Sequence, residues 1–257
     1  MTDEAQLDRG APDWFLPVKH EAFYWSQFVR GGRTFIDVGA HVGTWTLNLA
    51  RHFERVFAFE PDPRGATALR RNLEMGGITN VEVVPKAVSN KSGQVSLSLF
   101  PNPSTNTMMP LADCGRTDAP IGVHEVEAVS IDDFMAERKI FDLDFIKVDA
   151  EAAEMLVVQG GLETFRTQRP DFFIEMHGLF YTRLRKLLDF MECDVLDGGR
   201  SGLSLVRHRK VWPTFVPPNF RLYPHGTTPT VEDQRELRKQ HGIAWDPPPG
   251  FLSEEGR

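Results

Sequence analysis

Two short apolar segments, each ending beside or on an acidic residue, constrain the fold of this chain most strongly. The first, Thr34–Val38, runs directly into a turn that contains Gly39 and Gly43. The second, Val56–Phe59, is followed by Glu60, 21 positions after Gly39. A strand, a glycine turn, a helix and a second strand ending on an acid make up one half of a nucleotide-binding α/β sheet, in which that acid binds a ribose.

Asp37, just before the turn, narrows the kind of ligand that the turn would bind. A dinucleotide would place its pyrophosphate over the turn, at the positive end of the following helix. A carboxylate at this point would repel that anion, but it would suit a cationic amino group such as the methionine end of S-adenosylmethionine. Gly39 and Gly43 would let the backbone approach the ligand. We expect His41, inside the turn, to be a solvated loop histidine rather than a general base.

Length and composition predict one α/β domain with additional segments. The chain has 257 residues, of which 41% are hydrophobic and 25% are charged, as in ordinary globular proteins. Its net charge of -7 disfavours nucleic acid as a partner. It has neither a run of 18 apolar residues nor a signal-peptide pattern at its start, so we expect a cytoplasmic protein without a membrane span. Cys114 and Cys193 lack metal spacing and are expected to be reduced thiols.

Strand and helix patterns alternate from residue 33, which predicts a mostly parallel sheet with helices on both faces. The expected strands are 33–37, 56–60, 81–84, 143–149 and 171–177, and the expected helices are 43–53, 65–75, 151–160 and 179–191. A closing hairpin is expected at 194–196 and 203–207. Alternating apolar residues predict a half-exposed antiparallel strand at Gln94–Leu99, with Val126–Ile131 as its partner.

Three regions depart from this alternation. Residues 1–30 are aromatic-rich and are expected to form a helical cap over the sheet's edge, or a lid over the substrate. Residues 209–257 are proline-rich and form an extension after the 31–208 domain, with one helix expected at Val231–His241. Pro101–His124 is a long loop without periodicity; it could close over a substrate, where Met108 and Met109 would offer apolar contacts.

The densest group of charged side chains lies in Phe145–Glu154. Lys147 stands inside an apolar strand and therefore needs a partner, and Asp149 follows on the same side of that strand. Glu151 and Glu154 are expected to share the first turn of the next helix, where they either cap the junction or take part in the site.

Glu175 and His177 end the following strand and could meet Asp149 at the carboxyl edge of the sheet. Asp149 and His177 are the candidate general bases, with Glu175 as a residue that orients the base. The same three side chains could hold a divalent metal, or they could be solvated strand-end residues.

With these residues in place, the chain resembles the FkbM-type methyltransferase family. The matching pieces occur in the family's order within residues 33–177 and are Phe35–Gly43, Phe59–Pro61, Pro85–Ser89, Val129–Phe134 and Asp144–Glu154. The resemblance implies a three-layer class I (Rossmann-like) α/β fold, with S-adenosylmethionine as methyl donor. It also implies O-methylation, often of a sugar or natural-product hydroxyl.

The resemblance also implies a set of cofactor-binding positions. Asp37, Gly39 and Gly43 would surround the methionine moiety, and Glu60 would bind the ribose hydroxyls. Ala40, Ala87 and Asp149 complete the expected set. The family commonly has glycine where Ala152 stands. If that position needs a positive φ, alanine strains it.

We therefore expect methyl transfer from S-adenosylmethionine to a hydroxyl of a small-molecule acceptor. A nicotinamide-dependent oxidoreductase is one alternative, although a third glycine at the usual spacing is lacking. A nucleobase methyltransferase is a second, but Asp149–Ala152 stands where such enzymes often carry Asn/Asp-Pro-Pro-aromatic. A non-catalytic adenosyl-binding domain is a third alternative.

Overall fold

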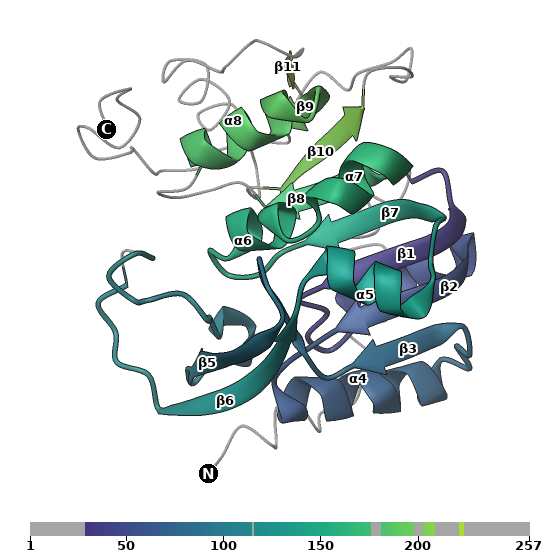
Figure 1. Ribbon diagram of the computed structural model, residues 1–257. Coiled ribbons are helices and arrows are strands. Elements are labelled where there is room, and N and C mark those ends of the chain that lie inside the picture. The colour runs from purple at the N-terminus through teal and green to yellow at the C-terminus, as the bar shows by residue number, and fades with distance from the viewer. Residues whose placement is uncertain (1–28, 115, 176–180, 198–202, 209–220, 224–257) are drawn as a thin grey trace.

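An eight-stranded sheet forms the centre of the molecule (Figure 1). The computed structural model describes residues 29–114, 116–175, 181–197, 203–208 and 221–223. The strand order is β11 (Arg221–Tyr223), β9 (Cys193–Asp197), β10 (Leu203–His208), β8 (Asp171–Glu175), β7 (Leu143–Val148), β1 (Gly32–Val38), β2 (Phe53–Phe59) and β3 (Val81–Val84).

The strand directions confirm the predicted, mostly parallel class I Rossmann-like sheet. Strands β8, β7, β1, β2 and β3 are parallel, whereas β10 runs antiparallel to both β8 and β9. From β1 the chain continues to β2 on one side and later enters β7 on the other. The order reverses between β1 and β7, and open α/β sheets bind ligands beyond the carboxyl ends of the strands at such a point.

Helices cover both faces of the sheet. One face packs against α5 (Ile131–Arg138), α6 (Glu154–Gln159), α7 (Leu162–Gln168) and α8 (Tyr181–Phe190), through a core that includes Ile36, Ile146, Phe172, Phe134, Val157 and Phe165. The other face packs against α3 (Thr44–Leu49), the 3-10 helix η2 (Ala50–His52) and α4 (Pro63–Met75). Its core includes Phe35, Phe145, Phe173, Trp45 and Leu49. Side chains alternate along each strand, so neighbouring residues of β1 and β7 supply different cores.

A small second sheet projects beside the main one (Figure 1). It contains β4 (Ala87–Val88), β5 (Gly93–Leu99) and β6 (Gly122–Val129), and β5 pairs with β6 in the predicted antiparallel sense. The partner strand begins four residues before the expected Val126 and ends at Val129, because Ile131 already begins α5. Between them, the long loop contains the 3-10 helix η3 (Pro103–Thr105) and an isolated bridge from Ser98 to Thr107. We call residues 87–129 the insertion.

Two predicted helices differ from the observed ones. The helix expected at 43–53 ends at Leu49 and continues as a 3-10 turn, because β2 already begins at Phe53. The helix expected at 151–160 begins only at Glu154, since Glu151 and Ala152 have φ angles of 48° and 78°. The prediction that Glu151 and Glu154 share a helical turn is therefore wrong.

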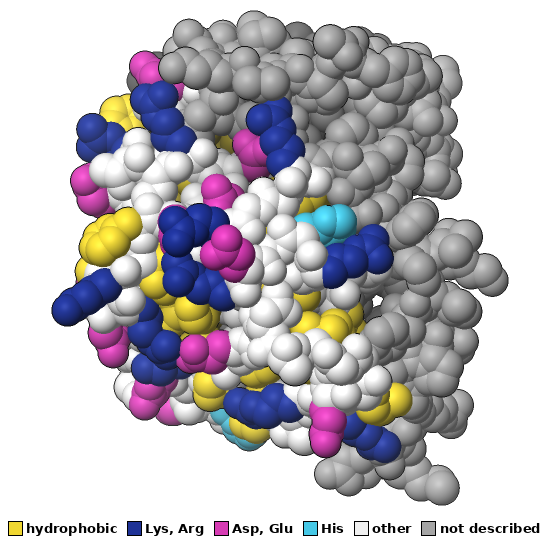
Figure 2. All heavy atoms as spheres, turned by 90° about the vertical axis from the view of Figure 1, so that its right-hand side faces the viewer, with side chains coloured by type: hydrophobic (Ala, Val, Ile, Leu, Met, Phe, Trp, Pro, Cys, Tyr) yellow, Lys and Arg dark blue, Asp and Glu magenta, His cyan; other side chains and the backbone are white. Residues whose placement is uncertain are grey.

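Several predicted features lie outside the described residues, among them the 1–28 part of the cap, His177 and the Val231–His241 helix. Within the predicted extension, Arg221–Tyr223 forms β11 and joins the main sheet beside β9. In the part of the chain that the structure describes, no helix is both long and apolar enough to cross a membrane. Figure 2 shows basic and acidic side chains interspersed over the described part of one face.

Candidate functional site

A cavity of about 550 Å³ lies at the carboxyl ends of β1, β2, β7 and β8, on the side where the insertion projects. Its position coincides with the reversal of strand order between β1 and β7. The lining residues are Val38, Gly39, Ala40, His41, Thr44, Trp45, Phe59, Glu60, Pro61, Lys86, Ala87, Val88, Leu97, Asn102, Pro103, Ser104, Asn106, Met108, Lys147, Asp149, Ala150, Glu151 and Glu175.

The register of the sheet brings charged side chains together beneath this cavity. Asp37 of β1 lies opposite Lys147 of β7, and Lys147 lies opposite Phe173 of β8. Residues two apart on a strand share a face, so Asp37, Lys147 and Glu175 all project from the face that α3 covers. Two carboxyl groups and one ammonium group, each from a different strand, thus lie on the same face of the sheet.

Lys147 is the centre of this group, and only 1% of it is exposed. Its ammonium group donates to the carbonyl oxygens of Val38 and Gly39, at 3.3 and 2.9 Å. It also forms ion pairs with Asp37 Oδ1 at 3.5 Å and Asp149 Oδ2 at 3.3 Å. Burial lowers the pKa of Lys147, but the charges of Asp149 and Asp37 outweigh this effect and raise the pKa above its ordinary value. Lys147 therefore remains charged, as the need for a partner predicted.

Asp37 does not line the cavity. It is fully buried, accepts a hydrogen bond from the Thr46 hydroxyl at 2.6 Å, and directs its other oxygen toward Lys147. The expected contact between Asp37 and a ligand's ammonium group does not follow from this geometry. Asp37 instead balances the charge of Lys147, which does line the cavity.

Four acidic side chains gather at the ends of β7 and β8. Ligand oxygens of Asp149, Glu154 and Glu175 all lie within 4.8 Å of one another. Burial, followed by the charge of Asp149, raises the pKa of Glu175 well above its ordinary value. Burial also raises the pKa values of Glu151 and Glu154 to about 7. The predicted metal set contained His177, which lies outside the described residues; among those described, Glu154 completes the group.

Glu60, at the end of β2, is held by the backbone of two turns. Its Oε2 accepts from the His41 N–H at 2.7 Å, and its Oε1 accepts from the Asp62 N–H at 2.8 Å. Only 7% of Glu60 is exposed, and burial raises its pKa to about 7 despite these two hydrogen bonds. Gly65 lies against the same side chain, where an added Cβ would come within 3.0 Å of Glu60 Cδ.

The two glycines of the turn have different roles. Gly39 has a φ of 73°, and an added Cβ would lie 1.9 Å from the Asp149 carbonyl oxygen. It therefore allows β1 and β7 to approach each other at the cavity wall. Gly43 has a φ of 97° and lies against Leu69 of α4, and it is not among the lining residues. Gly43 is therefore required by its positive φ and by the close packing of Leu69, and the expected contact with a ligand does not follow from its position.

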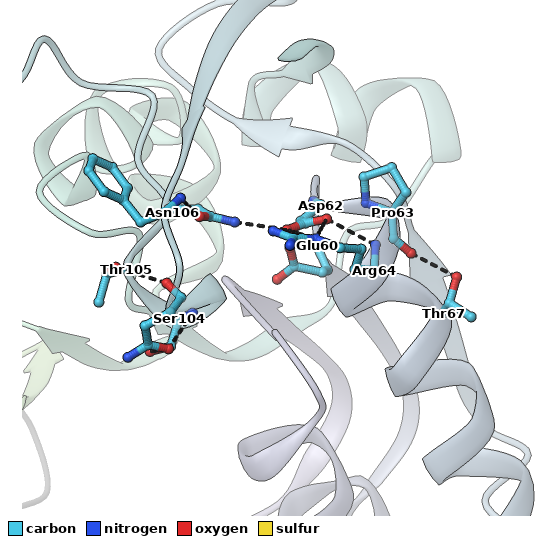
Figure 3. A network of polar contacts seen from close by, with 10 residues as sticks. Glu60, Asp62, Pro63, Arg64, Thr67, Ser104, Thr105 and Asn106 are labelled. Atoms are coloured by element: carbon cyan, nitrogen blue, oxygen red, sulfur yellow. Dashed lines mark hydrogen bonds and ion pairs between the residues drawn. The ribbon is translucent and has the colours of Figure 1, made fainter. Parts of the chain in front are cut away.

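The insertion is fastened to both halves of the sheet by adjacent residues. Asn106 donates from Nδ2 to Asp62 Oδ2 at 2.8 Å, and its Oδ1 accepts from the Phe100 N–H at 2.8 Å. Figure 3 shows this contact reaching the first turn of α4, where Asp62 also binds Arg64. Thr107 donates from its hydroxyl to the Glu151 carbonyl oxygen at 2.7 Å. The loop expected to close over a substrate thus contributes Asn102–Ser104, Asn106 and Met108 to the cavity wall.

Six of the predicted site residues line the cavity: Gly39, Ala40, Glu60, Ala87, Asp149 and Glu175. The sequence patterns did not assign Lys147 or His41 to the wall. The isolated lysine in an apolar strand was the available signal for Lys147. The signal for His41 was its place inside the turn, but the expectation of a solvated side chain is wrong, because its Nε2 atom is buried.

Comparison with known proteins gives one family match and several distant relatives. The sequence profile of the "Methyltransferase FkbM domain" matches residues 37–198. The chain is 26% identical over 142 residues to "Methyltransferase 1" of Beauveria bassiana, covering 49% of this chain and 57% of the relative. It is 27% identical over 149 residues to "2-O-methyltransferase NoeI" of Sinorhizobium fredii, covering 52% and 59%. The chain thus spans less than two thirds of the length of these curated relatives.

Among solved structures, the methyltransferase FkbM of Methylobacillus flagellatus aligns with 72% of this chain and 46% of its own, at 19% sequence identity and a TM-score of 0.49.

Proposed function

Since this chain belongs to the FkbM methyltransferase family, we propose that it transfers a methyl group from S-adenosylmethionine to a hydroxyl group of a small molecule, of the sugar or natural-product type. The observation that carries the proposal is the cavity at the carboxyl edge, which combines a buried, backbone-held Glu60 with Asp149 and Glu175. The name of the Sinorhizobium relative, a 2-O-methyltransferase, supports O-methylation.

The residues of the cavity fit an adenosyl ligand. Each oxygen of Glu60 accepts one backbone N–H, which leaves a lone pair on each for the two ribose hydroxyls. Gly39 presents no side chain to the ligand, and Asp149, whose carbonyl oxygen lies against Gly39, makes this wall acidic together with Glu151. An acidic wall favours a ligand with sulfonium and ammonium charges over a pyrophosphate. The volume of about 550 Å³ also falls within the usual range for small-molecule sites.

Bound S-adenosylmethionine would supply an electrophilic methyl group on a sulfonium. The protein's own task is then to hold the acceptor hydroxyl in line and to remove its proton. Asp149 is the proposed proton acceptor, since it lines the cavity and is 31% exposed at the side chain. Lys147, at 3.3 Å, fixes the Asp149 carboxylate, and Glu175 orients it from the neighbouring strand. His177 remains the second candidate base.

The proposed reaction uses no metal, because Lys147 forms an ion pair with Asp149 and the raised pKa values of Glu154 and Glu175 lower the negative charge of this group. The alternative, a divalent cation on these carboxyls, predicts loss of activity in EDTA and its recovery with added Mg²⁺ or Mn²⁺. Activity that is unchanged in EDTA supports the metal-free reaction.

The first experiment measures ligand binding by isothermal titration calorimetry with S-adenosylhomocysteine, and with NAD as the comparison. We expect binding of the former alone. The second incubates the protein with radiolabelled S-adenosylmethionine and a panel of sugars, phenols and alcohols. Transfer without an alcohol acceptor, or no binding of S-adenosylhomocysteine at millimolar concentration, contradicts the proposal.

Variants then assign the base. D149N should lower kcat by about 10²- to 10⁴-fold, a larger effect than its effect on the affinity for S-adenosylhomocysteine. E137Q, at an exposed carboxyl of α5, is the matched control and should behave like the wild type. If H177A loses activity and D149N does not, the base is His177 and the role given to Asp149 is wrong.

A further inference from the structure

The segment between β7 and α6 holds two consecutive residues in an unfavourable backbone conformation. Glu151 and Ala152 have φ angles of 48° and 78°, in the left-handed region that residues other than glycine seldom adopt. Such conformations persist only where the surrounding structure holds them, and they are concentrated at functional sites. The segment therefore depends on contacts from other parts of the chain.

Thr107 of the insertion supplies one such contact. Only 1% of Thr107 is exposed, and its hydroxyl donates to the Glu151 carbonyl oxygen at 2.7 Å while it accepts from the Met109 N–H at 3.0 Å. The backbone of Thr107 pairs with Ser98 in both directions, with N–H to oxygen contacts of 2.8 and 3.2 Å, which fixes Thr107 to β5. The single proton of this hydroxyl is thus directed at the segment that carries Glu151.

The half-buried side chain of Glu151 lines the cavity without a hydrogen-bond donor of its own. Among the residues that the structure describes, none donates a hydrogen bond to its carboxyl oxygens. The two cations whose charges reach it, Arg116 and Lys147, are each paired with another carboxylate, Asp118 at 2.6 Å and Asp149 at 3.3 Å. Burial, followed by the charge of Asp149, raises the pKa of Glu151 to about 7. A donor that enters the cavity would satisfy this carboxyl.

From these contacts we infer that Glu151 binds the acceptor, accepting a hydrogen bond from a second hydroxyl of that molecule, and that Thr107 is the positioning residue that holds Glu151 in the cavity wall. The inference rests on the proposed function, because it requires a hydroxyl-bearing acceptor in this cavity. Glu60, proposed to bind ribose, lies at the end of β2, whereas Glu151 follows the proposed proton acceptor Asp149 by two residues. The class of acceptor that this arrangement selects is a diol or polyol, to which sugars belong.

The test measures steady-state methylation at pH 8 with radiolabelled S-adenosylmethionine and the sugar or other polyol of the acceptor panel that the wild type methylates fastest. E151A should lower kcat/KM for this probe by about 10- to 100-fold, mainly through KM, because it removes a hydrogen bond to a charged group. T107V lacks the hydroxyl and should lower kcat/KM by about tenfold, whereas T107S keeps the hydroxyl and should stay within about threefold of the wild type. Since Thr107 acts through Glu151, the double variant T107V/E151A should fall no more than about threefold below E151A.

Two comparisons separate this role from a general loss of structure. Each variant should bind S-adenosylhomocysteine within about threefold of the wild type in calorimetry, because Glu60 is left intact. Thr67 is exposed on α4, and its hydroxyl also donates to a backbone carbonyl oxygen, that of Pro63, at 2.7 Å (Figure 3). T67V is therefore the matched control for T107V and should keep the kcat/KM of the wild type.

Three results would overturn the inference while leaving the proposed function intact. They are a folded E151A with the kcat/KM of the wild type, transfer to acceptors with a single hydroxyl alone, and effects of T107V and E151A that multiply in the double variant. A wild type that methylates no member of the panel refutes the proposed function itself. If T107V fails to fold, T107V/A152G replaces it in the same comparison, with A152G as its reference, because glycine adopts the positive φ without strain.

Discussion

Replacement of Lys147 by methionine tests whether the buried ion pairs hold the cavity floor together. The ammonium group has four oxygen neighbours between 2.9 and 3.5 Å, and K147M removes all of these contacts. Asp37, fully buried, would keep only the hydrogen bond from Thr46. Removing one partner of a buried ion pair costs about 3–5 kcal/mol, because the other charge is left uncompensated. We expect a loss of about 3 kcal/mol in the free energy of unfolding, since methionine retains part of the packing.

Urea unfolding followed by intrinsic fluorescence measures this loss, with an unchanged m-value as the check on two-state behaviour. The double variant D37N/K147M should lose at least about 1.5 kcal/mol less than the sum of its single variants, because the neutral amide that replaces the Asp37 carboxylate leaves no unpaired charge at position 37. R138M is the control: it breaks an exposed ion pair with Glu82 and should cost less than about 1 kcal/mol. Additivity within about 0.5 kcal/mol between D37N and K147M would refute the coupling.

Three further predictions concern the cavity wall. G39A should lower the melting temperature and weaken S-adenosylhomocysteine binding more than tenfold, as its Cβ would lie 1.9 Å from the Asp149 carbonyl oxygen; affinity equal to that of wild type refutes the close approach. The raised pKa of Glu154 means that the folded protein keeps a proton which the unfolded chain releases. The free energy of unfolding should therefore fall by about 1–3 kcal/mol per group of this kind as the pH rises from 4.5 to about 7. E154Q should flatten this slope in urea titrations, and an unchanged slope contradicts the assignment. N106A removes the hydrogen bond between the insertion and Asp62. It should raise the KM for the acceptor several-fold without changing the melting temperature by more than a few degrees. Limited proteolysis of N106A should cut within residues 101–121, and a cleavage pattern like that of the wild type contradicts the anchoring role of Asn106.

The acidic residues at the carboxyl ends of the strands were predictable, because local sequence patterns show where each strand ends. Glu60, Asp149 and Glu175 each follow or end an apolar strand, and parallel strands bring such ends to one edge. Their presence around one cavity therefore required only the fold class. The same holds for the β5–β6 pair, where alternation was visible in the sequence.

The role of Asp37 was not predictable from its neighbours in sequence. It depends on the register that places Asp37 opposite Lys147, 110 positions later in the chain. A shift by one residue would turn the side chain to the other face, and the local sequence does not specify that register. The turn geometry suggested a ligand contact, whereas long-range pairing made the carboxylate a buried counter-ion.

The sequence did not predict where α6 begins, because the backbone there depends on a tertiary contact. Residues 151–160 carry a helical pattern, but Thr107 binds the Glu151 carbonyl oxygen and the backbone takes positive φ at Glu151 and Ala152. The family commonly has glycine where Ala152 stands, and this difference was the one sequence signal of the positive φ. Alanine at a φ of 78° confirms the expected strain.

The fastening of the insertion by Asn106 and Thr107 has a consequence for protein engineering. These two consecutive residues reach α4 through Asp62 and the β7–α6 junction through Glu151, so one dipeptide links the loop to both halves of the sheet. If the loop contacts the acceptor of the proposed reaction, we expect that exchanging the residues on either side of the dipeptide with those of a relative changes the acceptor, provided that the dipeptide and its two partners are kept. The loop can therefore be treated as a cassette with a defined point of attachment.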